Sequence, residues 1–168
     1  MEKKFELTDN FIINAFGVKL FQIKCTKSFK YAKEGDLGGY VEKDENLDQE
    51  SDAWVSGDAR VYGDARVYGD ARVYGNAEVS GNARVYGNAE IDNNNKHCGF
   101  DCFGSANRHT HAYLTKENKV EITCGCFRGS IEEFEKRVEE THSGTIYEKQ
   151  YKAIIDVIKI KFGLTDLI

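Results

Sequence analysis

Residues 55–91 read VSGDAR VYGDAR VYGDAR VYGNAE VSGNAR VYGNAE I, one six-residue unit repeated with few changes. In each unit a small and an aliphatic residue stand two positions apart, as at Ala65 and Val67, so an extended chain points both to one face. Gly followed by Asp or Asn separates these pairs, and these residue types form turns at little cost. Each unit therefore predicts a short strand and a turn.

A fixed short period is typical of a solenoid, because one unit can bury its apolar face only against its neighbours. The repeat resembles the hexapeptide-repeat family, whose chains wind into a left-handed parallel β-helix with three units per coil. If 18 residues form one coil, Arg72 lies over Glu90, and Arg66 lies over Arg84 as a like-charged pair. We then expect three columns of stacked side chains: Val55–Val73–Ile91, Val61–Val79 and Val67–Val85.

The flanking segments complete a mainly β fold in three parts. Residues 1–36 predict a β-rich cap, with strands at KKFEL and FIINAF and a buried face that contains Val18, Leu20, Ile23 and Cys25. Residues 37–92 form the short left-handed β-helix. Its first coil is expected to be irregular, because Lys43 and Gln49 stand where the repeat requires aliphatic residues. Its expected apolar contacts are Val41, Leu47, Ala53 and Trp54.

Residues 93–168 predict a small ββαα lobe. The asparagine run after Ile91 ends the repeat and is interpreted as a hinge. HAYLT and KVEITCGCF predict two strands that form a hairpin. Ser130 and Glu133 have the spacing of a capping box and predict the start of one helix, and a second begins near Tyr147.

Several phrases outside the repeat carry a second resemblance. FELT, GDLGGYVE, ENL and AWVSG precede the hexapeptides, and CGCFRGSIEEFEKRVEETH follows them. In this order and wording they resemble a group of phage- and prophage-encoded hexapeptide proteins. The resemblance implies the β-helix fold and a phage or mobile-element setting, with little biochemistry attached.

Composition limits the classes of partner. With 23 basic and 28 acidic residues among 168, the net charge of −5 offers no general attraction to nucleic acid or to an anionic membrane. We find no apolar run that would span a bilayer and no apolar signal-peptide core in MEKKFELTDN. Five cysteines are an odd number, which fits reduced thiols. We therefore expect a cytoplasmic protein that binds no specific nucleic-acid sequence.

Two candidate sites lie in the C-terminal lobe. The first is a zinc site, because four thiols with histidines nearby suit tetrahedral coordination, although cysteines are also common core residues. Its candidate ligands are Cys98, Cys102, Cys124 and Cys126. The second is an anion site at the start of the first helix, where backbone N–H groups and the helix dipole attract negative charge. Its candidate residues are Asn107, Arg108, Tyr113, Phe127, Arg128 and Ser130. The alternative is that Ser130 and Glu133 satisfy those donors themselves.

The outward face of the β-helix is a third candidate. Tyr62, Tyr68 and Tyr86 recur on a regular surface, and Tyr and Arg are enriched at interface hot spots. The hexapeptide resemblance implies a homo-oligomer, most simply a trimer, packed through these side chains. It also raises the alternative of an acyltransferase with a histidine base. All histidines, however, lie beyond the repeat: His97, His109, His111 and His142.

Together these observations favour a non-enzymatic binding protein. In a phage setting it would antagonise a host factor, either by occupying a host defence protein or by sequestering a small anionic, nucleotide-like signal. The alternatives are an acyltransferase-like enzyme and a purely structural oligomeric scaffold.

Overall fold

The computed structural model describes residues 3–165, and the chain divides into two compact units, residues 1–94 and 95–168. The predicted cap and the predicted β-helix both lie in the first unit. They share that unit because strands of the cap and strands of the repeat belong to one sheet.

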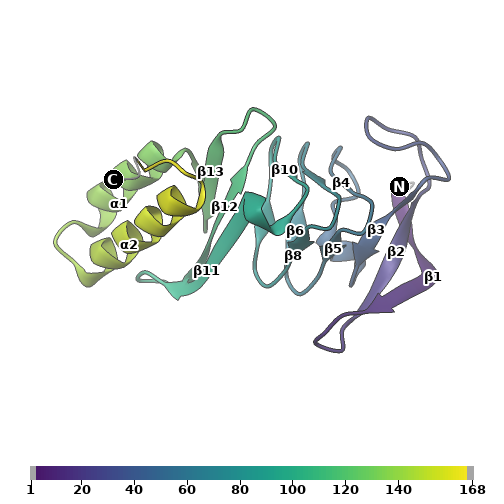
Figure 1. Ribbon diagram of the computed structural model, residues 1–168, viewed down its shortest axis with the longest axis horizontal. Helices are drawn as coiled ribbons and strands as arrows, with labels where there is room; N and C mark the ends of the chain where they lie inside the picture. Colours follow the sequence, from purple (N-terminus) through teal and green to yellow (C-terminus); the bar gives the residue numbers. More distant parts are fainter. Residues whose placement is uncertain (1–2, 166–168) are drawn as a thin grey trace. The chain divides into compact units, whose positions relative to one another are not determined.

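The repeat forms stacked coils of two-residue strands (Figure 1). The strands are β4 (Trp54–Val55), β5 (Arg60–Val61), β6 (Arg66–Val67), β7 (Arg72–Val73), β8 (Glu78–Val79), β9 (Arg84–Val85) and β10 (Glu90–Ile91). Parallel pairing gives three sides, β4–β7–β10, β5–β8 and β6–β9. Val73 pairs with both Val55 and Ile91, and the other two expected columns also form. The predicted 18-residue coil is therefore confirmed.

Glycine is required where the coils turn. Gly69 has a φ of +76°, a conformation that L side chains rarely adopt. A Cβ atom added there would lie only 2.9 Å from the backbone nitrogen of Gly87 in the next coil. Turns of successive coils thus stack backbone on backbone, which explains why the repeat keeps Gly at this position.

The first coil is longer than the others. Here β3 (Leu37–Val41) pairs with β5, and Val41 lies beside Val61; Leu47 lies beside Val67. The paired residues are twenty positions apart in the sequence, whereas those of the later coils are eighteen apart. Two extra residues are therefore accommodated between Leu47 and Val55. This insertion explains why the phase of the repeat fails at Lys43 and Gln49. The expected apolar contacts Val41, Leu47, Ala53 and Trp54 are all buried.

The cap is an antiparallel extension of the same sheet. Its strands β1 (Phe5–Ile13) and β2 (Lys19–Cys25) precede β3 in the order β1-β2-β3-β5-β8. The two strands predicted at KKFEL and FIINAF are one strand, because β1 pairs with β2 at both ends and only shifts register between Leu7 and Phe11. Of the expected buried face, Leu20, Ile23 and Cys25 are fully buried and Val18 is half-buried.

The second unit is a four-stranded antiparallel sheet with two helices on one face (Figure 1). Its elements are β11 (His97–Phe103), β12 (Arg108–Leu114), β13 (Val120–Cys124), β14 (Phe127–Gly129), α1 (Ile131–His142) and α2 (Ile146–Lys161). The lobe therefore has four strands before its two helices, two more than the expected ββαα order. The segment that follows the asparagine run contains β11, whose Cys98 and Phe100 pack against the helical core.

Apolar side chains from the sheet and both helices form that core. It contains Ala112, Ile122, Cys124, Ile131, Phe134, Val138, Tyr151, Ile154, Ile155 and Ile158. The predicted capping box is confirmed, since Ser130 and Glu133 each accept a hydrogen bond from the other's backbone N–H.

Within the described residues, no helix combines the length and apolar character that a membrane span requires.

Candidate ligand-binding groove

The chain itself covers the β4–β7–β10 side of the β-helix. Phe29 packs edge-on against Trp54, with ring centroids 5.4 Å apart. The Tyr31 hydroxyl donates to Asp70 at 2.7 Å, and the Arg72 guanidinium lies 5.1 Å from the Tyr31 ring centroid. The loop that precedes β3 therefore occupies this side.

The β5–β8 side is balanced in charge. Arg60 lies next to Glu78 on the neighbouring strand, and the Tyr62 hydroxyl donates a hydrogen bond to the same carboxylate. Tyr62, predicted as an interface residue, thus has its phenol directed to an intramolecular partner.

The β6–β9 side differs, because Arg66 lies next to Arg84. Both side chains are exposed, and Arg66 makes no ion pair with any described residue. By contrast, Arg72 Nη1 lies 3.0 Å from Glu90 Oε1 on the covered side. At the strand spacing of about 5 Å, two like charges repel on the order of 1 kcal/mol in water. An anion bound between them would remove that repulsion.

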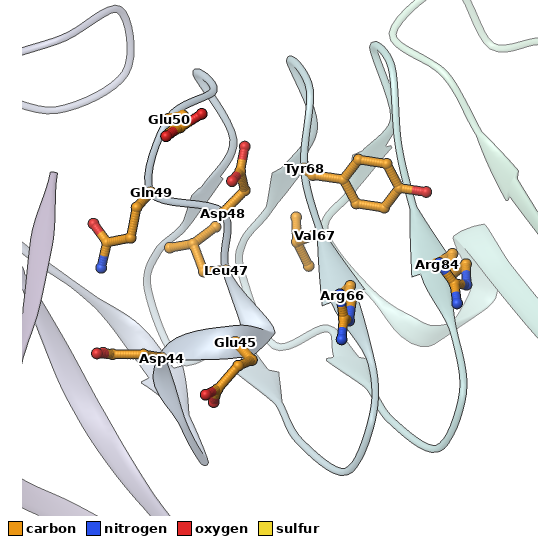
Figure 2. A pocket seen from close by; sticks show the side chains of 10 residues that line it. All are labelled: Asp44, Glu45, Leu47, Asp48, Gln49, Glu50, Arg66, Val67, Tyr68 and Arg84. Carbon is orange, nitrogen blue, oxygen red and sulfur yellow. The ribbon is translucent and has the colours of Figure 1, made fainter. Parts of the chain in front are cut away.

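A groove of about 600 Å³ runs along this side, a volume typical of small-molecule sites. Figure 2 shows Arg66 and Arg84 side by side on adjacent coils, with the Tyr68 ring extending above them. Tyr68 is supported by Tyr86, whose ring centroid lies 4.5 Å away. Two of the three predicted interface tyrosines therefore lie on this side.

The longer first coil, which stacks beside β6, supplies the acidic wall of the groove. Asp44 is paired with Lys3 at 2.7 Å, and Asp48 accepts a hydrogen bond from the Ser51 backbone N–H at 3.0 Å. Glu45 and Glu50 are exposed at the rim. One wall thus offers guanidinium donors and an aromatic ring, and the other offers carboxylate acceptors.

In the anion site predicted in the C-terminal lobe, Arg128 and Ser130 already have carboxylate partners. The Arg128 guanidinium binds Glu121 through two contacts, Nε–Oε1 at 2.6 Å and Nη2–Oε2 at 3.0 Å. The Ser130 backbone N–H donates to Glu133 Oε2 at 2.8 Å, and the Ser130 hydroxyl donates to Glu132 at 2.7 Å. The alternative reading of this helix start is therefore the one observed, because carboxylates already occupy it.

The two aromatic candidates, Tyr113 and Phe127, are engaged in intramolecular contacts. Tyr113 is fully buried, and its hydroxyl donates to Glu121 at 2.6 Å. Phe127 packs on Phe134 with ring centroids 5.0 Å apart. Phe127 and Arg128 do line one hollow of about 460 Å³, but its other charged residues are of both signs.

The other two candidate residues lie at turns. Asn107 is exposed with a φ of +48°, in the turn between β11 and β12. The Arg108 guanidinium lies against Gly125, where an added Cβ would be 2.8 Å from Nη1. Neither residue lines the hollow beside Arg128.

The structure does not bring the four candidate zinc ligands together. Cys124 is buried in the core and Cys98 packs against it, whereas Cys102 and Cys126 are exposed. Burial raises the pKa of the Cys98 thiol to about 11, which opposes the thiolate that zinc binds. Among residues 3–165, no three His, Cys, Asp or Glu side chains are grouped so as to hold a metal ion.

A histidine network lies on the sheet face opposite the helices. His97 Nδ1 lies 3.0 Å from His111 Nε2, and His109 Nδ1 lies 2.7 Å from Asp101 Oδ1. Alternation in RHTHAY would have indicated that His109, His111 and Tyr113 share a face. His111 and Tyr113 are buried, so these side chains are not open to a ligand.

Comparison with known proteins bears on the repeat. A family model described as the YdcK beta solenoid repeat matches residues 53–69 and 65–79. These residues include β4 to β8, and the match agrees with a β-solenoid architecture for this segment. A search of curated proteins finds no match.

Proposed function

We propose that this chain is a non-enzymatic binding protein that captures a small anionic, nucleotide-like ligand in the β6–β9 groove. The observation that carries the proposal is the Arg66–Arg84 pair, two exposed cations side by side. In the other strand pairs of the repeat, Arg lies beside Glu or beside an uncharged residue. The 18-residue coil also supports the left-handed β-helix that the hexapeptide resemblance implies.

The arginine pair suits a phosphate group. Guanidinium groups donate two parallel hydrogen bonds to a phosphate, and charge-assisted bonds are about twice as strong as neutral ones. A phosphate shared between Arg66 and Arg84 would also screen their mutual repulsion. A pair of lysines would offer charge without this planar geometry.

The remaining groove residues suit a base. The Tyr68 ring, backed by Tyr86, offers a surface on which a base stacks, and such stacking contributes roughly 1–3 kcal/mol. Asp48 and Glu50 on the neighbouring first coil can accept hydrogen bonds from amino groups of a base. The acidic wall also disfavours ligands that carry only negative charge.

In the phage setting that the resemblance implies, capture of such a ligand would remove a host signal. The rival proposal is that Tyr68 and Tyr86 pack against a host protein or against further copies in a homotrimer. An acyltransferase would need a base on the coils, and the repeat contains no histidine.

The proposal is tested by calorimetric titration of the full chain with ADP and with inorganic phosphate. We expect wild type to bind ADP, affinity to fall as salt rises, and Arg66→Gln to weaken binding by about tenfold or more. Arg60→Gln on the β5–β8 side is the matched control and should bind as wild type does.

Two results would contradict the proposal. If Arg128→Ala abolishes ADP binding and Arg66→Gln does not, the site lies in the C-terminal lobe. If wild type binds neither probe and Tyr68→Ala lowers the mass measured by light scattering, the groove is a protein interface.

A further inference from the structure

Helix α2 carries apolar side chains on two sides. Its buried side, Tyr151, Ile154, Ile155 and Ile158, packs in the core of the second unit. A second set is exposed: Ile146 at 61%, Val157 at 49% and Ile160 at 65%, together with Ala153. At 3.6 residues per turn, Ala153, Val157 and Ile160 lie about 140° around the helix from the buried side. A helix that is apolar on two sides is normally covered on both.

The exposed set has the spacing of a coiled-coil seam. Ile146 and Ala153 are seven residues apart, and Ala153, Val157 and Ile160 follow at intervals of four and three. This is the alternation by which heptad positions a and d meet a partner helix. Leu164, 55% exposed, is held beyond the helix end by its N–H bond to Lys159 O at 2.8 Å.

The charges beside the seam indicate the partner. With Val157 at position a, Asp156 takes position g of the preceding heptad and Lys161 takes position e of the heptad that Val157 begins. Asp156 is exposed and forms no ion pair with any residue that the structure describes. In a parallel pair, a g residue meets the e residue five positions later on the partner. Asp156 would therefore meet Lys161 of an identical helix.

We propose that the exposed face of α2 binds α2 of a second copy of this chain, with the two helices parallel. An antiparallel pair would bring g positions to g positions and e positions to e positions, so Asp156 would not meet Lys161. The outer face of α1 offers no comparable seam, because its exposed positions are largely Glu, Lys and Arg. The contact is independent of the ligand groove, so either proposal can fail without the other.

The test is sedimentation of the full chain over a range of concentrations. We expect Ile160→Asp to weaken self-association by about tenfold or more, a loss of about 1.4 kcal/mol. Ile13→Asp is the matched control, because Ile13 on β1 is exposed to the same degree, 64%. It should associate as wild type does.

A charge exchange tests the direction of the helices. Asp156→Lys and Lys161→Glu should each associate more weakly alone, because each creates a like-charged pair. An equimolar mixture of the two variants should recover association, because both cross-pairs become opposite in charge. If Ile160→Asp associates like wild type, or if the mixture associates no more strongly than either variant alone, the proposal is wrong.

Discussion

Val41 lies beside Val61, twenty residues later in the chain, although the coils that follow repeat after eighteen. The two additional residues fall in the segment that contains Gln49. Its side-chain amide accepts hydrogen bonds from the backbone N–H groups of Lys4 and Phe5, at 2.8 and 3.2 Å, and donates to Phe5 O at 3.1 Å. The insertion therefore joins the first coil to the start of the cap.

Replacing Gln49 with Ala should destabilise the protein by about 1–3 kcal/mol, because backbone groups of Lys4 and Phe5 lose their partner. Glu50→Ala is the control, since Glu50 is exposed at the neighbouring position. Denaturant unfolding measures both. Equal stability of the two variants would show that the amide does not hold the cap.

Val67→Asp should unfold the β-helix. Val67 is fully buried between Leu47 and Val85, and an unpaired buried charge costs several kcal/mol. Arg66→Asp, one residue earlier on the same strand but exposed, should leave the melting temperature close to that of wild type. Thermal unfolding followed by circular dichroism compares them, and a folded Val67→Asp variant would contradict the stacked core.

Stability should rise as pH increases from about 8 to 10.5. Burial lowers the pKa of Lys4 from 10.5 to about 8, and its ammonium donates to Ser51 O at 2.6 Å and Ala53 O at 2.8 Å. Between these pH values the unfolded chain binds more protons than the folded one, so deprotonation favours folding. Below about pH 8 the full cost of burying the charge remains.

The variant Lys4→Met isolates this effect, because it has no amine to titrate. The difference in unfolding free energy between wild type and Lys4→Met should change in favour of wild type over that interval, by at most about 3 kcal/mol. A difference that stays constant with pH would exclude the lowered pKa.

Ser130→Ala should cost about 1 kcal/mol, because the backbone N–H of Glu133 loses its cap. Ser143→Ala, just after α1, should cost less, since no side-chain cap there is lost. Unfolding in urea measures the two variants. Equal losses of unfolding free energy in the two variants would contradict the capping role of Ser130.

The regular coils could be predicted from the sequence because any error in register would bury charged side chains and expose apolar ones. A shift of one residue would bury Arg72 and expose Val73, and the Arg72–Glu90 pair fits only the 18-residue offset. The twenty-residue coil could not be predicted, because the two added residues are located by the pairing of Leu47 with Val67 and of Val55 with Val73, and Gln49 is held there by Phe5, a contact distant in sequence.

The C-terminal lobe was less predictable. Its first strand contains polar residues and Gly99, which resemble a loop in sequence, and Cys102 adopts a φ of +64° there. The pairing of Arg128 with Glu121 joins residues on two strands of a hairpin, and no local pattern indicated that this carboxylate would face the guanidinium. The burial of Tyr113 likewise depends on tertiary packing.

The most direct test of the proposed function is a crystal structure of the full chain grown with ADP. We expect phosphate density between the guanidinium groups of Arg66 and Arg84, with the base against Tyr68. Density for the phosphates at Arg128 and Ser130 instead, or an empty β6–β9 groove at saturating ADP, would contradict the account.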